Sequence, residues 1–219
     1  MRTRLQTVPG TTCTIRRVAD STSNDALLEA ADAFARGRLS ERRYDHTVRV
    51  ADTAESLARK HGLDPVRTRL SALLHDAARE TAPEEFLTLA NEWDLSVGEP
   101  ERQSPKLLHG PVAAELARRE LGVEDEEVLS AIRAHTVGAA GMGPLALALY
   151  VADKIEPARD YPSVHRIRDL ARKDLREAAT ESLRRAIAHN EGRGKSIHPA
   201  SREMLEWLEH TQDAAHRGM

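Results

Sequence analysis

The sequence predicts an all-α fold, a single helical bundle, on three observations. Segments of helix length, with apolar residues at 3.6-residue spacing, follow one another along almost the whole chain. No run of strand length alternates apolar and polar residues. Hydrophobic residues make up 40% of the chain but aromatic residues only 3%, so the core must be built from Leu, Ala, Val and Ile.

Glycine and proline residues separate these segments and supply several of the signals at their ends. Ser40 is a candidate N-cap for the second helix, and Pro65 suits the first turn of the third. Pro83 opens the fourth helix with acidic residues behind it, while Gly62 and Gly122 are typical of C-terminal stops. The predicted helices span, in order, residues 24–36, 40–61, 65–80, 83–93, 107–121, 124–136, 144–156, 163–172, 174–191 and 199–212.

A chain of 219 residues suits one large domain, which we expect to cover residues 24–213. Residues 1–23 are predicted to form a disordered tail, and residues 214–219 a flexible C-terminus. The longest polar connection, residues 92–106, has helical pattern on both sides. It is therefore a candidate loop over a site rather than a linker between domains.

Charge and cysteine content exclude several classes of protein. The net charge of −3 gives no global attraction to nucleic acid or to an anionic membrane, so we expect neither as a partner. The single cysteine, Cys13, excludes a disulfide framework within the chain and a cysteine-based zinc site, and it favours a cytoplasmic location. The longest apolar run, residues 144–152, is too short to span a bilayer.

Histidine and aspartate residues occur on the apolar stripes of five predicted helices. One histidine on such a stripe is usually a hydrogen-bonded core residue, but six residues form a different case. They are His46, His75, Asp76, His109, His135 and Asp153. Imidazole and carboxylate groups are the ligands expected for first-row metals such as Fe, Mn, Zn or Ni, and bundles commonly build metal sites from facing helices. Periodicity indicates that each residue faces inward, not that the six converge.

The order H…HD…D formed by these residues resembles the signature of the HD-domain superfamily of metal-dependent phosphohydrolases. The two further histidines, between the HD doublet and the last aspartate, resemble the subset of that superfamily that binds two metals. From about Ser40 to Leu208 the chain is similar to the YqeK family, the bacterial symmetrical diadenosine tetraphosphate (Ap4A) hydrolases. The similar stretches are RRYDHTVRVADTAESLAR (42–59), ALLHDAARE (72–80), LLHGPVAAELARRELGVEDEEVLSAIRAHTVGAAGM (107–142), VADKIEPARDYPSV (151–164) and GKSIHP (194–199).

This resemblance implies a single HD-domain helical bundle and an enzyme that cleaves Ap4A into two ADP. It implies that the six residues bind two metal ions, with Asp76 as the bridging ligand. Iron is the expected metal, with Mn or another divalent ion as the alternative. The resemblance also implies a pocket near Arg159, Asp160 and the turn at residues 138–142.

The chain departs from the family pattern at three positions, none of which is a predicted ligand. Arg79 replaces the usual Lys, Lys154 stands where many members have an aromatic residue, and Ala158 replaces a usual Gly. These differences bear on the preference for a nucleotide and on the rate. They leave the predicted metal chemistry unchanged.

We expect an activated hydroxide to attack the central β-phosphorus of Ap4A, with Asp76 and Arg79 as the catalytic residues. Arg79, Lys154 and Arg159 are expected to neutralise phosphate oxygens, because arginine pairs with phosphate bidentately and stays charged. Asp160 and His198 complete the predicted substrate-binding residues.

Alternatives stay open at two of these positions, and at Glu156. Arg79 could pair with Glu80 or Glu84 instead of the substrate. His198, in the loop GKSIHP, could line a pocket or serve a turn. Glu156 could orient a ligand histidine or lie at the surface.

Two other functions compete with Ap4A hydrolysis. Another HD phosphohydrolase could act on nucleoside monophosphates or cyclic dinucleotides, although the GYP motif of cyclic-di-GMP phosphodiesterases is missing. A helical protein that senses nucleotides or metals without turnover is the non-enzymatic alternative. The apolar stripes do not decide between a monomer and a homodimer.

Overall fold

The computed structural model describes the backbone of residues 12–217 and the side chains of residues 23–210, and all regular structure in that part is helical. The predicted all-α class is therefore confirmed. In chain order the elements are α1 (Thr12–Arg38), α2 (Glu41–Lys60), α3 (Pro65–Leu74), α4 (Pro83–Glu92), α5 (Glu99–Gln103), the 3₁₀-helix η1 (Pro105–Leu108), α6 (His109–Leu121), α7 (Glu126–Ala134), α8 (Pro144–Ile155), α9 (Val164–Ala171), α10 (Leu175–Glu191) and α11 (Pro199–Arg217).

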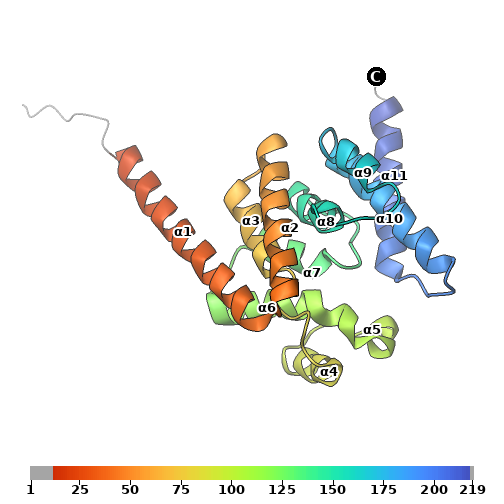
Figure 1. Cartoon of the computed structure of the whole chain (residues 1–219), viewed down its shortest axis with the longest axis horizontal. Coiled ribbons are helices and arrows are strands. Elements are labelled where there is room, and N and C mark those ends of the chain that lie inside the picture. Colours follow the sequence, from red (N-terminus) through yellow and green to blue (C-terminus); the bar gives the residue numbers. More distant parts are fainter. Residues whose placement is uncertain (1–11, 218–219) are drawn as a thin grey trace, which may run out of the picture.

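Helices α2, α3 and α8 pack against one another at the centre of the bundle. Helix α2 packs most extensively against α3 and also against α8, while α7 packs against α3, α6 and α8. Helices α9, α10 and α11 cover one side through contacts of α10 with α8, and α1 leans against α3 and extends away from the other side (Figure 1). Within the described residues, every helix is too short or too polar to cross a membrane.

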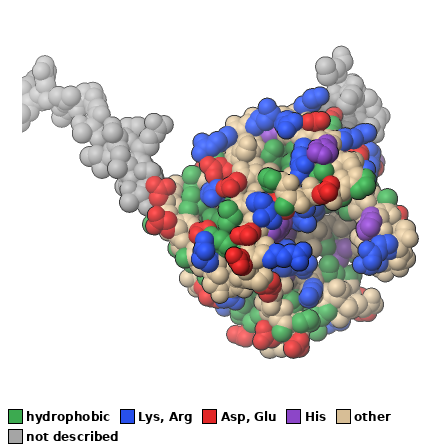
Figure 2. All heavy atoms as spheres, in the orientation of Figure 1, with side chains coloured by type: hydrophobic (Ala, Val, Ile, Leu, Met, Phe, Trp, Pro, Cys, Tyr) green, Lys and Arg blue, Asp and Glu red, His purple; other side chains and the backbone are tan. Residues whose placement is uncertain are grey.

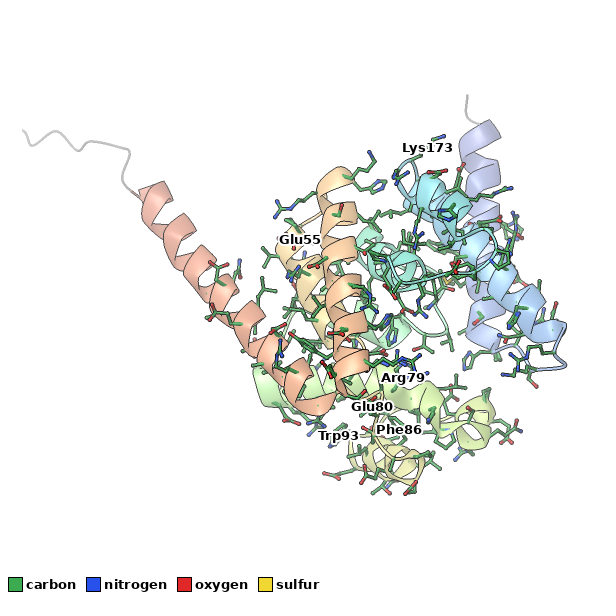
Figure 3. The ribbon with its side chains drawn as sticks, in the orientation of Figure 1. Glu55, Arg79, Glu80, Phe86, Trp93 and Lys173 are labelled. Carbon is green, nitrogen blue, oxygen red and sulfur yellow. The ribbon has the colours of Figure 1, made fainter. Side chains whose placement is uncertain are left out.

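The core has the aliphatic character that the composition predicts. Leu, Ala, Val and Ile make up most of its buried side chains, and the large exceptions are Phe86 and Tyr150, both fully buried. Phe86 lies in α4, and Trp93 is the C-cap residue of the same helix (Figure 3). Leu73 and Leu74 are buried as expected at the end of α3.

The ends of the chain differ from their predicted boundaries. Helix α1 begins at Thr12, so it overlaps the predicted tail over residues 12–23, and α11 continues to Arg217. The Ser, Thr and Asp residues near the predicted boundary are weak helix formers, which is why the sequence pattern fades there. Residues 1–11 and 218–219, and the side chain of Cys13, lie outside the described part.

The predicted helix over residues 65–80 is too long, because α3 ends at Leu74. Beyond that residue the backbone bonds span three residues instead of four, as in the bond from Ala77 N to the carbonyl oxygen of Leu74 (3.1 Å). The predicted helices over 107–121 and 124–136 are shortened in the same way, so that α6 begins at His109 and α7 ends just before His135. Three of the predicted ligands therefore stand at helix ends.

The polar connection over residues 92–106 holds two short helices that the sequence pattern does not predict. Helix α5 begins after Gly98, whose N–H donates to the side chain of Glu101 (2.8 Å). The 3₁₀-helix η1 follows at once and leads into α6. Each element is too short for hydrophobic periodicity to register.

An ion pair fixes α3 and α7 side by side at their N-terminal ends. Arg67 of α3 donates from Nε and Nη2 to the two carboxylate oxygens of Asp125, at 2.6 and 2.7 Å. Asp125 is also the N-cap of α7 and accepts from the N–H groups of Glu127 and Val128. Because both helices end at predicted ligands, this contact helps to set their register.

Asp125→Ala should lower the free energy of unfolding by about 1–2 kcal/mol, because α7 loses its cap and Arg67 keeps only Glu127 of its two carboxylate partners. Asp125→Asn keeps a side-chain oxygen at the N-cap of α7, so the free energy of unfolding should fall by less than in Asp125→Ala. Asp169→Ala removes only an exposed ion pair with Arg172 and should change stability by less than about 0.5 kcal/mol. Urea unfolding measures all three, and equal losses for the two alanine variants would contradict the role of this contact.

Candidate metal centre

The structure brings the six predicted metal ligands together in the core. All are buried, with exposed fractions between 0% for His75 and 8% for Asp153. They come from five separate segments: α2, the end of α3, the start of α6, the end of α7, and α8. Periodicity alone does not show that these side chains converge, and the structure shows that they do.

Three of the histidines are oriented by the backbone of the helix turn that precedes them. In each, Nδ1 lies within hydrogen-bonding distance of the carbonyl oxygen three residues earlier: His75 with Ala72 (2.6 Å), His109 with Lys106 (2.6 Å) and His135 with Ile132 (2.7 Å). Because a carbonyl oxygen only accepts, Nδ1 must carry the hydrogen. The Nε2 atom of each neutral ring then presents a lone pair to the centre.

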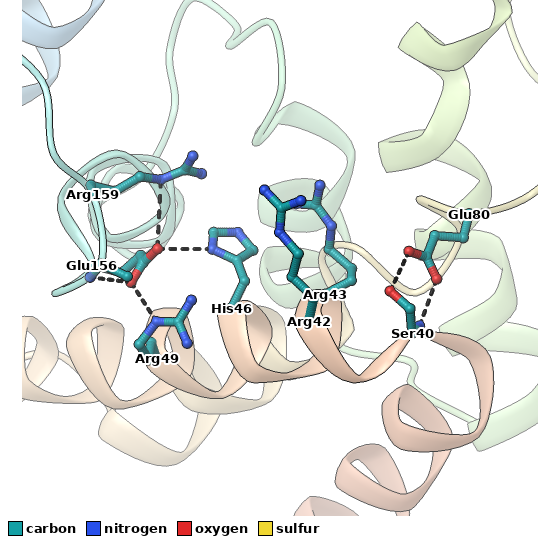
Figure 4. A pocket seen from close by; sticks show the side chains of 9 residues that line it. Ser40, Arg42, Arg43, His46, Arg49, Glu80, Glu156 and Arg159 are labelled. Carbon is teal, nitrogen blue, oxygen red and sulfur yellow. Dashed lines mark hydrogen bonds and ion pairs between the residues drawn. The ribbon is translucent and has the colours of Figure 1, made fainter.

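Glu156 gives His46 the same orientation from a different element. His46 Nδ1 lies 3.2 Å from Glu156 Oε1, and the other oxygen of this carboxylate accepts from Arg49 Nε (2.7 Å) and Ala158 N (2.8 Å) (Figure 4). Glu156 is only 2% exposed. The alternative of a surface position for Glu156 is therefore wrong, and its carboxylate fixes the ring of His46.

The Asp76 carboxylate is shared between two groups of histidines. Its Oδ2 lies 3.6 Å from His75 Nε2 and 4.0 Å from His46 Nε2. Its Oδ1 lies 3.4 Å from His109 Nε2 and 3.6 Å from His135 Nε2. Two triads that could each hold a metal ion therefore have Asp76 in common.

Asp153 completes the centre on the side of His46. Its Oδ1 lies 3.1 Å from His46 Nε2 and accepts from Arg159 Nη2 (2.7 Å), while its Oδ2 pairs with Lys154 Nζ (2.5 Å). Burial alone raises the pKa of Asp153, but the charge of Lys154 and the contact with His46 outweigh it, and the pKa lies well below its usual range. Asp153 is therefore ionised.

The Asp76 carboxyl is ionised because nearby groups outweigh the effect of burial, as at Asp153. Burial raises the pKa of this carboxyl, but the surrounding imidazoles His75, His109 and His135 hold it well below its usual range. Arg43 Nη1 also donates to Asp76 Oδ2 at 3.1 Å. By contrast, burial lowers the pKa of His75 to about 4, so this ring is neutral at pH 7.

The donor set fits divalent metal ions. The Nε2 atoms of His46 and His75 are buried without a hydrogen-bond partner in the described part of the chain. Those of His109 and His135 lie only 3.1 Å apart, although both carry lone pairs. The hydroxyl of Thr136, 3.0 Å from His109 Nε2, has one hydrogen and can satisfy only one of the two. Inward lone pairs beside two carboxylates are the arrangement that a cation stabilises.

Gly110 allows the second triad to form. A Cβ atom at this position would lie 2.9 Å from the carbonyl oxygen of Arg133 and 3.3 Å from His135 Nδ1. The start of α6 therefore rests directly on the end of α7, which places the rings of His109 and His135 4.9 Å apart. Glycine is the residue that permits such a close approach.

A cavity of about 410 Å³, here called the central cavity, opens onto the metal centre. Arg79, Lys154 and Arg159 line it together with Asp76, so these three predicted phosphate-binding residues lie beside the predicted ligands. The carboxylate of Glu80 accepts hydrogen bonds from the N–H and the hydroxyl of Ser40. No ion pair of Arg79 with Glu80 or Glu84 is found among the described residues. Figure 3 labels Arg79 and Glu80 below the end of α2, and Figure 2 shows Lys and Arg side chains gathered on this face.

Other predicted substrate-binding residues are placed differently. His198 lines a neighbouring cavity of about 810 Å³ and pairs through Nε2 with Glu101 (2.8 Å). Asp160 is exposed and does not line the cavities beside the centre. The turn at residues 138–142 also contributes nothing to their walls, because Gly138 packs against Met204 instead.

Sequence reasoning missed several cationic residues that surround the centre. Arg42, Arg43 and Arg49 line a third cavity, of about 440 Å³, into which His46 also points (Figure 4). They stand three or four residues from His46 on α2, and therefore on its face of the helix. That spacing is the signal that could have identified them. Thr136 was missed as well, although it directly follows His135.

Comparisons with known proteins agree with this geometry. Residues 43–158 match the family model described as HD domain. The chain is 37% identical over 180 residues to a protein of Bacillus subtilis (strain 168) named bis(5'-nucleosyl)-tetraphosphatase, symmetrical, which covers 82% of this chain and 96% of that protein. It is 39% identical to a protein of the same name from Halalkalibacterium halodurans, over 74% of this chain and 86% of that one.

A solved structure is similar to this chain in its fold. It is a predicted HD superfamily hydrolase involved in NAD metabolism from Clostridium acetobutylicum, with a TM-score of 0.81 and 31% sequence identity. The alignment covers 84% of this chain and 97% of that protein. The helical scaffold that carries the centre is therefore shared with a solved relative.

Gly110→Ala should weaken metal binding by about 10- to 100-fold, because the added methyl group pushes His109 away from His135. Calorimetric titration with Mn²⁺ measures the affinity, and circular dichroism checks that the helices remain. Gly37→Ala is the control, since a Cβ there meets nothing within 4 Å and the residue lies inside α1. Unchanged Mn²⁺ affinity in Gly110→Ala would show that the close approach is unimportant for the centre.

Proposed function

The chain belongs to the HD-domain family, with symmetrical bis(5'-nucleosyl)-tetraphosphatases as relatives over most of its length, and from that premise we propose that it hydrolyses Ap4A to two ADP at a centre of two metal ions. The observation that carries the proposal is the position of Asp76. Its two oxygens face two different pairs of histidines, and the cationic side chains of the central cavity stand beside them.

Six residues of the chain would hold the ions. His46 and His75 face one oxygen of Asp76, with Asp153 beside His46, and His109 and His135 face the other oxygen. Two bound ions would activate a water molecule and polarise phosphate oxygens. Imidazole and carboxylate ligands suit iron, our proposed metal, as well as Mn and other divalent ions.

The remaining residues act on the phosphates. Arg79 has no ion pair among the described residues, so its guanidinium is available to a bound phosphate. Lys154 and Arg159 already neutralise Asp153 and have further donors that face the cavity. Burial lowers the pKa of Lys154, but Asp153 and Tyr150 together outweigh it and raise the pKa above its usual value, so the amine stays cationic. These three cations would stabilise charge that develops on the phosphates.

The substrate, the location and the oligomeric state remain predictions. A dinucleoside polyphosphate is the proposed substrate, and a cytoplasmic location follows only from the single cysteine. A homodimer is neither required nor excluded by the site, because all six proposed ligands come from one chain.

The wild-type protein, supplied with Fe²⁺ or Mn²⁺, should convert Ap4A into ADP as the only nucleotide product. Asp76→Ala should lose both the bound metal and the turnover while its helical circular dichroism is retained, because the two triads lose their common ligand. Asp45→Ala, an exposed aspartate beside His46, is the matched control and should keep both. Chromatography of products and elemental analysis test this, and AMP with ATP as products would overturn symmetrical cleavage.

Arg79→Ala should lower kcat/KM for Ap4A by about 10²-fold, because a donor to the charged phosphates is lost. Metal content should not change, since the substitution keeps the backbone N–H that bonds to the carbonyl oxygen of Asp76, and the Arg79 side chain pairs with none of the proposed ligands in the described structure. Arg79→Lys keeps the charge and should retain most of the activity. Full activity of Arg79→Ala in steady-state assays would mean that Arg79 is only a surface charge.

A further inference from the structure

The metal centre lies between two cavities of opposite character. On one side is the cavity of about 440 Å³, here called the arginine cavity, which shares Arg43 and Arg159 with the central cavity. On the other is the cavity of about 810 Å³, here called the apolar cavity, which shares Leu107, Thr136 and Lys154 with it. The three cavities therefore share walls and lie next to one another around the centre.

The arginine cavity is suited to phosphate. Four guanidinium groups, from Arg42, Arg43, Arg49 and Arg159, and two carboxylates, from Glu80 and Glu156, line it. Both carboxylates have partners: Glu80 accepts from the N–H and hydroxyl of Ser40, and Glu156 accepts from His46 Nδ1 and Arg49 Nε.

The guanidinium groups of this cavity retain free donors. Arg49 bonds to Glu156 only through Nε, and Arg42 is exposed and forms no ion pair among the described residues. Figure 4 shows Arg42 and Arg43 on one side of the His46 ring and Arg159 on the other. Ala158 is the only aliphatic residue in the lining, so a base would find no apolar wall there.

The apolar cavity is suited to a nucleoside. Its walls include Leu107, Val137 and Tyr150 on the side of the centre, and Leu183, Ile187 and Ile197 from α10 and the loop before α11. Polar and charged side chains line it as well, among them Gln103, Asn190 and Lys195. Apolar walls beside polar groups that can fix the orientation of a ligand are typical of sites for organic ligands.

We propose that the two ends of the substrate are recognised by different chemistry: the apolar cavity binds one nucleoside, and the arginine cavity binds only phosphate at the other end. The inference rests on the proposed Ap4A hydrolase function and extends its substrate class. A nucleoside 5'-tetraphosphate, which has a nucleoside at one end only, is then also a substrate.

For adenosine 5'-tetraphosphate the reaction gives ADP and pyrophosphate. The oxygen of a water molecule bonds to the β-phosphorus, and the bond from that phosphorus to the oxygen bridging to the γ-phosphorus breaks. The bridging oxygen and its electron pair leave with pyrophosphate. One proton of the water is released to solvent or taken up by pyrophosphate, and no oxidant or reductant takes part.

The test compares adenosine 5'-tetraphosphate with Ap4A, using the full chain loaded with Mn²⁺ and product analysis by chromatography and ³¹P NMR. Wild-type protein should cleave the tetraphosphate to ADP and pyrophosphate, with kcat/KM within about tenfold of that for Ap4A, since only one end differs. Cleavage of Ap4A without cleavage of the tetraphosphate would overturn this inference and leave the proposed function standing. Cleavage of neither would overturn both.

Two variants test which cavity binds which end. Arg42→Gln should raise KM for the tetraphosphate about tenfold and that for Ap4A less, because the free terminal phosphate carries more charge. Ile197→Ser should raise both KM values equally, because both substrates place a nucleoside in the apolar cavity. Arg172→Gln, remote from the three cavities, should change neither. A larger effect of Arg42→Gln on Ap4A would place a nucleoside against the arginines and contradict the assignment.

Discussion

Four imidazole lone pairs and two carboxylates meet inside an aliphatic core, and this concentration of electron-rich atoms is the constraint on which the rest of the site depends. Burial of such groups is costly unless positive charge accompanies them. The chain supplies part of that charge through Arg43 on Asp76 and through Lys154 and Arg159 on Asp153. Bound metal ions would supply the rest, since the lone pairs of the imidazoles are directed toward the place where ions could bind.

The backbone holds this arrangement through helix ends rather than helix faces. His75, His109 and His135 stand where a helix begins or ends, and each ring donates to a carbonyl oxygen one turn earlier. Such a bond orients the ring without a second side chain, so no further polar group must be buried. His46 is different because it lies within α2, and it needs the buried carboxylate of Glu156 for the same purpose.

Hydrophobic periodicity predicted the six inward-facing residues and nearly all the helices, because both follow from one local pattern. It could not place the end of α3, since residues beyond Leu74 still look helical and only the ligand geometry requires the tighter turn. It also missed Arg42 and Arg43, because an arginine on a helix is ordinarily a solvated surface charge. Their role depends on a cavity between segments far apart in the sequence, which no local pattern describes.

The distribution of cations narrows the kind of phosphate ligand that suits the site. Arg79 and Lys154 lie in the central cavity, whereas Arg42 and Arg49 lie beyond His46, on the far side of the metal centre from the apolar cavity. A single phosphate at the centre could pair with only one of these groups and would leave the other solvated. A polyphosphate chain that passes the centre can pair with both, and each added phosphate oxygen replaces water on a fixed guanidinium or ammonium group. On the proposed function, the separation of these cations would therefore favour a long phosphate chain over a single phosphate.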